Sequence, residues 1–180
     1  MTLMSQPATT TPQLDGLVTA TRAALNHRAD WQRTAQLVAS ALRRHLPSPE
    51  VVPGDQERPH SQLLHVEPDG AFSIQAVVWP PGRVTRIHDH VSWCVFGVIQ
   101  GVVDEELFTL DGSGEFLVPG GHSTNATGAV NGFAPPGDIH RVANTSGHTA
   151  ISINVYGTDL SRIGSSPLRY YDLPVAPEID

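Results

Sequence analysis

The sequence predicts an antiparallel all-β fold with α-helices at its N-terminal end. From Phe72 onward the chain consists of short apolar or alternating runs separated by clusters of Gly, Pro, Asn and Asp. Such runs with turn signals at nearly regular intervals are typical of an antiparallel sandwich or barrel. No helical period interrupts them, which argues against a parallel sheet of strand–helix–strand units. The expected strands are Phe72 to Trp79, Val84 to His90, Cys94 to Ile99, Val102 to Leu110, Glu115 to Val118, His140 to Val142 and Thr149 to Tyr156.

Two amphipathic helices are expected before this β region, forming a helical cap over residues 13–47. Apolar residues recur near helical spacing from Leu14 to Leu25 and again from Trp31 to Leu46. Asp30 stands at the N-cap position of the second helix. Prolines and a glycine end the helical region after residue 46. The first twelve residues are rich in Thr, Pro and Ser, and we expect them to be disordered.

Length and composition indicate one domain over residues 13–180, with the β-barrel at about 60–160 and a C-terminal segment at 161–180. The net charge of −7 argues against nucleic acid or an anionic membrane as the main partner. No apolar run approaches the roughly 20 residues of a membrane span, and the first residues lack signal-peptide features. A single cysteine, Cys94, excludes an internal disulfide and fits a reducing compartment. We therefore expect a cytoplasmic protein.

Three histidines in two separate segments form the candidate metal site. His88 and His90 flank Asp89, and His140 follows fifty residues after His90. Successive side chains of a strand point to opposite faces, so the two imidazoles converge while Asp89 faces away. A third histidine on a neighbouring strand completes the site. Imidazoles suit iron, copper, nickel and zinc, and three neutral histidines leave coordination positions open for reactants.

The segments around these histidines resemble the two motifs of the cupin superfamily. Gly82 precedes His88 by six residues and Gly101 closes the first segment. The second segment reads Pro135-x-Gly137-x-x-His140-x-x-x-Asn144. This resemblance implies a double-stranded β-helix, which is a jelly-roll-like barrel, with the metal ligands facing its interior. The apolar faces of the N-terminal helices would then cover one side of that barrel.

The first motif departs from the usual cupin pattern at Cys94, seven residues before Gly101. Cupins usually place a fourth ligand there, a glutamate, so its absence leaves a neutral three-histidine face. Along a straight strand Cys94 would lie about 13 Å beyond His90, at roughly 3.3 Å per residue. The chain must therefore turn at Val91 to Trp93 for the thiol to approach the metal. Direct ligation and a buried apolar role both remain open for Cys94.

A neutral face lets ferrous iron, Fe(II), keep its double charge and favour an anionic thiolate and a reduced oxygen species as further ligands. In this respect the chain, from about Gln62 to Tyr171, is similar to the cupin thiol dioxygenases, the family of cysteine dioxygenase and 3-mercaptopropionate dioxygenase. In that family the glutamate position is held by cysteine, glycine or another non-ligand. A cysteine there can form a thioether with an active-site tyrosine, and Cys94 matches this type.

The tyrosine of that resemblance is Tyr156. Ser152, Asn154 and Tyr156 alternate along one strand, so their polar groups lie in a row that can relay hydrogen bonds to substrate or oxygen. The family pattern is Ser-x-His-x-Tyr, and this chain carries Asn154 in place of the histidine. Asparagine donates and accepts hydrogen bonds but takes up no proton near neutrality, so rate, pH dependence or reaction outcome could differ here.

The resemblance also directs attention to the group that binds the substrate's carboxylate. Cysteine dioxygenases place an arginine where this chain has Gln62, so the bidentate guanidinium clamp is missing there. The chain is thus similar to the glutamine-bearing bacterial branch, which favours 3-mercaptopropionate and takes an arginine from its C-terminal segment. Arg169 is the candidate for that arginine, and Arg162 is the second choice.

These observations favour an iron-dependent thiol dioxygenase that converts 3-mercaptopropionate, cysteine or a close analogue to its sulfinic acid with O2. Tyr156, Ser152, Asn154 and Cys94 would serve the reaction. A second reading is a related cupin oxygenase of secondary metabolism that takes a cysteine-like substrate beyond the sulfinate. A third is a non-catalytic metal-binding or sensory cupin. A zinc hydrolase is less favoured because Asp89, the nearest carboxylate base, should point outward. The sequence leaves the oligomeric state open.

Overall fold

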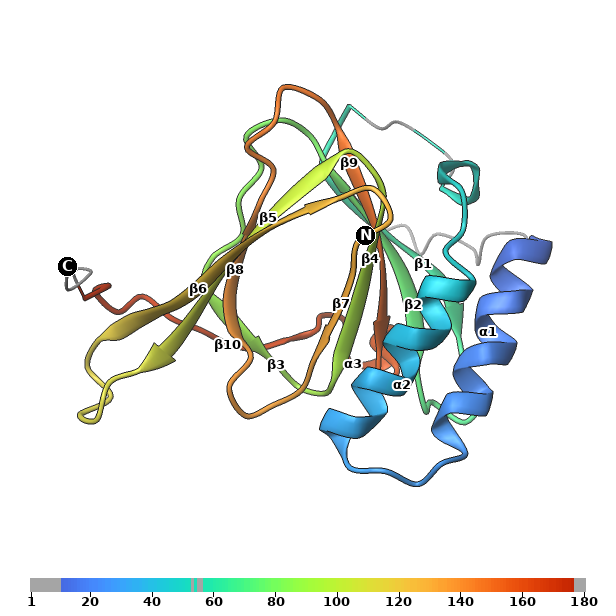
Figure 1. The fold of residues 1–180 in the computed structure, drawn as a ribbon, viewed down its shortest axis with the longest axis horizontal. Helices are drawn as coiled ribbons and strands as arrows, with labels where there is room; N and C mark the ends of the chain where they lie inside the picture. Colours follow the sequence, from blue (N-terminus) through green and yellow to red (C-terminus); the bar gives the residue numbers. More distant parts are fainter. Residues whose placement is uncertain (1–10, 53, 55–56, 177–180) are drawn as a thin grey trace.

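Two antiparallel five-stranded sheets form the body of the protein, shown by a computed structural model that describes residues 11–52, 54 and 57–176 (Figure 1). The first sheet has the order β1-β2-β9-β4-β7. Its strands are β1 (His60–Val66), β2 (Ser73–Trp79), β9 (Ala150–Tyr156), β4 (Cys94–Gln100) and β7 (Val130–Phe133). The second sheet has the order β10-β3-β8-β5-β6. Its strands are β10 (Pro167–Tyr170), β3 (His88–His90), β8 (Ile139–Ala143), β5 (Val102–Leu110) and β6 (Leu117–Ala126).

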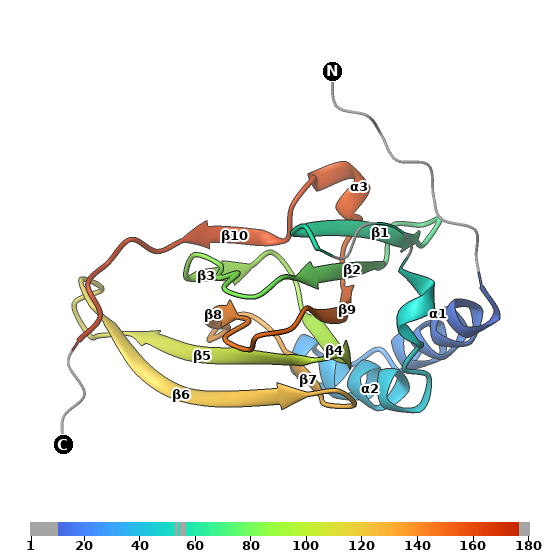
Figure 2. The same cartoon turned by 90° about the horizontal axis from the view of Figure 1, so that it is seen from above.

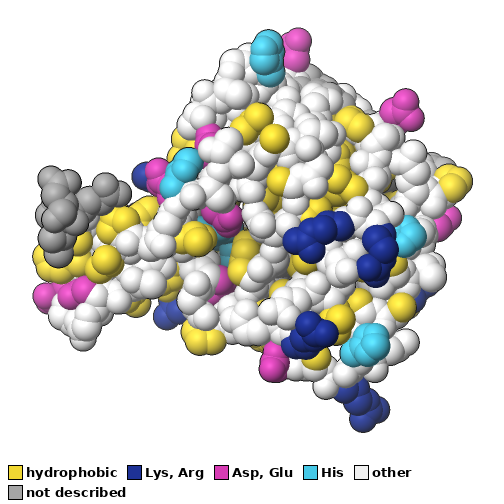
Figure 3. All heavy atoms as spheres, in the orientation of Figure 1, with side chains coloured by type: hydrophobic (Ala, Val, Ile, Leu, Met, Phe, Trp, Pro, Cys, Tyr) yellow, Lys and Arg dark blue, Asp and Glu magenta, His cyan; other side chains and the backbone are white. Residues whose placement is uncertain are grey.

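The helices form a separate layer on the outer face of the first sheet (Figure 2). Helices α1 (Pro12–Leu25) and α2 (Trp31–Arg44) pack against each other, and α2 packs on β4 and β7. Asp30 caps α2 as expected, because its carboxylate accepts from the backbone N–H of Arg33 at 2.7 Å. The outer surface of this layer is basic, and Figure 3 shows arginine side chains gathered over α2.

The short elements lie at the ends of the helical layer and the barrel. A 3-10 turn (Pro49–Val51) follows α2, and the short helix α3 (Leu160–Ile163) leads into β10. Residues 1–10 of the segment expected to be disordered lie outside the described residues. Of that segment's last two residues, Thr11 caps α1 and Pro12 begins it, so the helix starts slightly earlier than expected.

The fold class predicted from the sequence is confirmed, and the largest boundary differences among the expected strands are at two of them. The expected strand from Val84 to His90 is reduced to β3, because the Thr85 hydroxyl accepts from the Val142 N–H where a strand would offer a carbonyl. Strand β6 continues well past Val118, because a register shift opposite Leu107 accommodates its Pro-Gly-Gly stretch.

The buried apolar residues of the described part form four clusters, and the two largest lie on opposite sides of the first sheet. The larger cluster lies between the helices and the first sheet and includes Leu42, Phe72 and Ile153. A second cluster, with Trp79 and Phe96, lies between the two sheets. Alternation along each strand of the first sheet therefore sends one set of side chains to the helices and the other set into the barrel. None of the helices in the described part of the chain is long and apolar enough to cross a membrane.

Candidate metal centre and pocket

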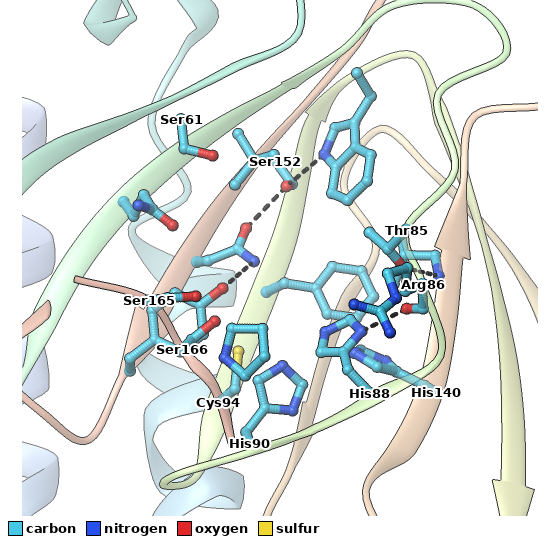
Figure 4. Close-up of a pocket in the computed structure, with 18 of the residues that line it drawn as sticks. Ser61, Thr85, Arg86, His88, His90, Cys94, His140, Ser152, Ser165 and Ser166 are labelled. Carbon is cyan, nitrogen blue, oxygen red and sulfur yellow. Dashed lines mark hydrogen bonds between the residues drawn. The ribbon is translucent and has the colours of Figure 1, made fainter. Parts of the chain in front are cut away.

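Three buried imidazoles meet on the inner face of the second sheet. His88 and His90 come from β3 and His140 from β8, and His88 pairs directly with His140 in the strand register. The ring centroids are 4.7 to 4.9 Å apart, and one ligand atom from each residue lies within 4.8 Å of the others. Figure 4 shows the three rings turned toward one another at the wall of the pocket. The convergence expected from the sequence is therefore present.

Each imidazole is oriented through its Nδ1 atom. Nδ1 of His88 lies 2.8 Å from the backbone oxygen of Arg86, and Nδ1 of His90 lies 3.1 Å from Asp138 Oδ2. Nδ1 of His140 lies 2.7 Å from Glu105 Oε1. An acceptor at Nδ1 places the proton there and leaves the Nε2 lone pair free for a metal.

The donor set fits a resident transition metal. His140 Nε2 is buried and has no hydrogen-bond partner among the described residues, which is costly unless something binds it. Burial and the neighbouring imidazoles of His140 and His90 lower the pKa of His88 to about 3. Burial also lowers the pKa of His90, although Asp138 opposes this effect. Neutral imidazoles are the protonation state that metal binding requires.

Cys94 lies beside Tyr156 and not within the histidine cluster. The two residues face each other in the pairing of β4 with β9, and they pack in one buried cluster. The turn expected at Val91 to Trp93 is present between β3 and β4, and it brings Cys94 to the wall of the pocket. Burial raises the pKa values of both the Cys94 thiol and the Tyr156 hydroxyl, so both groups are protonated at neutral pH.

A row of hydrogen bonds leads from Tyr156 away from the histidines. The Asn154 Nδ2 atom donates to the Tyr156 hydroxyl at 3.1 Å, and Ser152 Oγ donates to Asn154 Oδ1 at 2.8 Å. Trp79 Nε1 then donates to Ser152 Oγ at 3.0 Å. Asn154 therefore occupies the middle of the row as both donor and acceptor. Figure 4 shows Ser152 at the opposite end of the row from His90 and Cys94.

Asp89 points away from the imidazoles, as the alternation of the strand predicts. Its carboxylate accepts from the backbone N–H and the guanidinium of Arg169, and from the Tyr171 hydroxyl at 2.8 Å. These contacts fasten the C-terminal strand β10 to the strand that carries two of the histidines. We call this group, Asp89 with Arg169 and Tyr171, the Asp89 clamp.

The structure does not bring the three expected substrate-binding residues to the pocket. Arg169 is held by Asp89 with 62% of its side chain exposed, and Arg162 is 82% exposed beside Asp159. Gln62 pairs with Ala76, which packs into the helix-side core, so its side chain shares that outer face. None of the three lines the cavity. The assignment of a substrate carboxylate to these three residues therefore stays a prediction, which the cavity lining does not support.

The cavity between the sheets has a volume of about 520 Å³. The metal end holds the three histidines together with Cys94 and Tyr156, and the aromatic rings of Phe133, Phe96 and Trp79 line its walls. Phe133 lies 5.0 Å from His90 and 4.9 Å from His140 between ring centroids. Two arginines, Arg83 and Arg86, also line it.

Sequence reasoning did not assign roles to Glu105, Asp138, Trp79 or Arg83. The sequence carried one signal for Asp138, because this residue stands two positions before His140. In the structure Asp138 is buried beside His90. Glu105 shares a face of β5 with Val103, so it is a carboxylate at an inward position, where a charged side chain is uncommon. The position of Arg83 depends on a loop, and periodicity carries no information about it.

Comparison with known proteins matches one family model and several solved structures. The family model of cysteine dioxygenase type I matches residues 51–166. A double-stranded β-helix protein from Klebsiella pneumoniae aligns at 16% identity and a TM-score of 0.46, over 61% of this chain and 85% of that chain. A cupin 2 conserved barrel protein from Salinispora arenicola aligns at 19% identity and a TM-score of 0.43, over 66% and 92% respectively. A cupin superfamily protein from Desulfitobacterium hafniense aligns at 14% identity and a TM-score of 0.46, over 63% and 91%.

Proposed function

The chain belongs to the cysteine dioxygenase type I family, and on this premise we propose that it oxidises a thiol to its sulfinic acid with O2 at ferrous iron. His88, His90 and His140 would hold the iron. Among small substrates, 3-mercaptopropionate, cysteine and their close analogues are the candidates. In the overall reaction R–SH and O2 give R–SO2H, so the sulfur is oxidised, dioxygen is reduced and both oxygen atoms end on sulfur.

One observation carries this proposal: three buried imidazoles converge, each with its Nδ1 atom beside a hydrogen-bond acceptor, and no carboxylate belongs to the ligand set. Ferrous iron, when bound, supplies adjacent positions at which a thiolate sulfur and dioxygen meet, and the redox chemistry that joins them. The three oxygen atoms that accept hydrogen bonds from the Nδ1 atoms keep the imidazoles in one tautomer and one orientation. The chain itself therefore contributes a fixed face of three imidazoles on one side of the reacting atoms.

Tyr156 would act as the proton-bearing group at the reacting end of the pocket. Burial raises the pKa of its hydroxyl, so the group remains a donor at neutral pH. Asn154 donates to the same oxygen at 3.1 Å and so supports donation of the phenol proton toward the cavity. Trp79 donates to Ser152, and Ser152 donates to Asn154, so the Asn154 amide has a fixed orientation. The row can therefore orient the Tyr156 hydroxyl without the histidine of the family pattern.

Apolar rings exclude water around the imidazoles. Phe133 packs against both His90 and His140, and Phe96 and Val142 also line the cavity. A dry lining strengthens the electrostatic interactions of the reacting groups and limits side reactions with water.

The proposal is tested by reconstituting the protein anaerobically with Fe(II) and measuring oxygen uptake on a panel of thiols. We expect thiol-dependent uptake, and loss of both iron binding and uptake in His140→Ala. A Tyr156→Phe variant should bind iron normally and turn over about a hundredfold more slowly, in the range typical of a lost proton donor. Iron-loaded protein that consumes no oxygen with any thiol would favour the sensory alternative.

Asn154 keeps one enzymatic alternative in view, because it replaces the histidine of the family pattern. In that alternative the oxidation passes beyond the sulfinate, with loss of the carboxylate or transfer of nitrogen. Product mass decides between the two readings. A sulfinate gains two oxygen atoms and keeps every carbon of the thiol.

A further inference from the structure

The cavity is much larger than a three-carbon thiol requires. Its volume of about 520 Å³ lies within the roughly 300–1,000 Å³ of pockets that enclose drug-sized ligands. A three-carbon thiol acid spans only about 4 Å from sulfur to carboxylate carbon, at roughly 1.2 Å per bond of an extended chain. Such a molecule would occupy the metal end and leave the remainder to water.

The strands show how far the cavity extends from the metal end. Tyr156 and Cys94 form one level, and Asn154 and Phe96 form the next. Ser152 lies at a third level, where the Trp79 indole donates to it. Tyr156 and Ser152 are four residues apart on one strand, so their Cα atoms are separated by about 13 Å at roughly 3.3 Å per residue. Their side chains lean toward each other, because the amide of Asn154 alone joins the two hydroxyl groups.

Arg83 stands at the far level without a counter-ion. Its Cζ atom lies 4.9 Å from the centroid of the Trp79 ring, and Nη1 donates to the Val78 carbonyl at 2.6 Å. The side chain is half-buried and lines the cavity, and no carboxylate of the described residues forms an ion pair with it. A partly desolvated guanidinium with unused donors is costly unless an anion binds it, and its planar fork suits a carboxylate.

The charged side chains of the cavity wall also favour an anion as the ligand of Arg83. Among the described residues, Arg83 and Arg86 are the charged side chains of the cavity wall apart from the histidines, and no carboxylate lines it. Arg86 already has a carboxylate partner, because it donates to Asp172 at 2.7 Å, and it also stacks on Tyr170. Figure 4 places Arg86 beside His88, whereas Arg83 belongs to the Trp79 level. The free cation therefore lies at the end away from the imidazoles.

We propose that the preferred substrate is an elongated anionic thiol whose carboxylate binds Arg83 and whose sulfur reaches the three-histidine centre. The chain between the two ends lies along the apolar wall of Phe96, Val103 and Val142. This inference rests on the proposed function and specifies its substrate class. A small thiol acid cannot contact Arg83 and the centre together, so chain length and charge become the determinants of specificity.

The test compares ω-mercapto acids of increasing length with a neutral alcohol. The probes are 3-mercaptopropionate, 6-mercaptohexanoate, 8-mercaptooctanoate and 6-mercaptohexanol. Each buried methylene contributes a factor of about four, so kcat/KM should rise tenfold or more from the shortest acid to the longer ones. The six-carbon acid should exceed the alcohol by about tenfold, because only the acid binds Arg83.

Variants assign this preference to Arg83. In Arg83→Gln, kcat/KM for the two longer acids should fall tenfold to a hundredfold, mainly through KM, while 3-mercaptopropionate and 6-mercaptohexanol keep their values. Arg83→Lys keeps the positive charge but loses the planar, bidentate guanidinium, so kcat/KM for the two longer acids should fall by an intermediate factor. Arg162→Gln removes an exposed arginine outside the cavity and should change nothing. A flat length profile, or equal turnover of acid and alcohol by the unmodified protein, overturns the proposal even if an Arg83 variant fails to fold.

A binding measurement separates this inference from the proposed function. Metal-free protein is titrated calorimetrically with octanoate and, separately, with octanol. We expect octanoate to bind about tenfold more tightly than octanol, and to lose that advantage in Arg83→Gln and not in Arg162→Gln. If no thiol is oxidised but octanoate binds as stated, the proposed reaction fails while the anion site stands. If thiols are oxidised but octanoate has no advantage, the anion site fails and the reaction stands.

Discussion

At the scale of single residues, the centre depends on the acceptors behind the imidazoles as well as on the imidazoles. The histidines could be predicted because strand alternation makes His88 and His90 converge, and because His140 sits in a second motif. Glu105 could not be matched to His140 in the same way, because their contact arises from the pairing of β5 with β8. Contacts between strands depend on register, which one sequence does not specify.

Removing the acceptor behind His140 should weaken metal binding without removing a ligand. In Glu105→Ala, Nδ1 of His140 loses its 2.7 Å partner, and we expect iron affinity to fall about tenfold to a hundredfold. Glu106→Ala is the matched control, because Glu106 is the next residue on β5 and pairs outward with Arg141. The iron affinity of each variant is measured by competition with a chelator of known affinity. Equal iron affinity in the two variants would contradict this role for Glu105.

The contact between Cys94 and Tyr156 predicts a covalent link after turnover. The residues are paired across β4 and β9, and they pack in one buried cluster. Joining sulfur to a ring carbon removes one hydrogen from each residue, with O2 as the oxidant. We expect intact protein that has turned over to be two hydrogens lighter than its sequence mass, and Cys94→Ser to show the full mass. A full mass for the unmodified protein after many turnovers would exclude the link.

At the scale of elements, the strands with clear alternation were predicted and those with mixed patterns were not. The sequence indicated β2, β4, β5, β8 and β9 nearly to their ends. It did not indicate β1, β7 or β10, in which glycine, proline or several polar residues interrupt the apolar pattern. These three strands lie at sheet edges, where a strand buries fewer side chains and needs a weaker apolar pattern.

Arg169 lies on one of these edge strands, β10, and the sequence analysis assigned it to binding the substrate carboxylate. Its position in a C-terminal strand was consistent with the family resemblance, but pairing with β3 directs it to Asp89. In Arg169→Gln we expect amide exchange of β10 to accelerate about fivefold to tenfold, because a charge-assisted hydrogen bond is lost. The KM for 3-mercaptopropionate should stay unchanged. Hydrogen-exchange mass spectrometry and thiol kinetics measure these effects, and a large rise in KM with unchanged exchange would restore Arg169 as an anchor.

The helical layer should contribute stability independently of the pocket. Leu42 of α2 is fully buried in the core between the helices and the first sheet, and it does not line the cavity. Leu42→Ala should lower the free energy of unfolding by about 2–5 kcal/mol through lost burial and a residual cavity. Arg44→Ala, on the exposed end of the same helix, should change it by less than about 0.5 kcal/mol. Urea unfolding gives both values, and a loss below about 1 kcal/mol for Leu42→Ala would contradict this packing.

At the scale of the whole molecule, stability and chemistry occupy different spaces. The helices and the outer face of the first sheet hold the larger apolar cluster, while the space between the sheets holds the imidazoles, the hydrogen-bonded row and Arg83. Strand alternation makes this division possible, because one strand such as β9 supplies Ile153 to the core and Asn154 to the pocket. The sequence predicted this plan, but the size of the pocket and the position of its free arginine depend on three-dimensional packing.

The most direct test of the account is oxygen-isotope labelling of the product formed by the iron-loaded protein. The protein is supplied with 18O2 and a thiol that it consumes, and the molecular mass of the product is measured by mass spectrometry. The account predicts a sulfinic acid in which both oxygen atoms carry the label, and no product from His140→Ala. A product with one labelled oxygen or none, or equal turnover by His140→Ala, would contradict a dioxygenase centred on these three histidines.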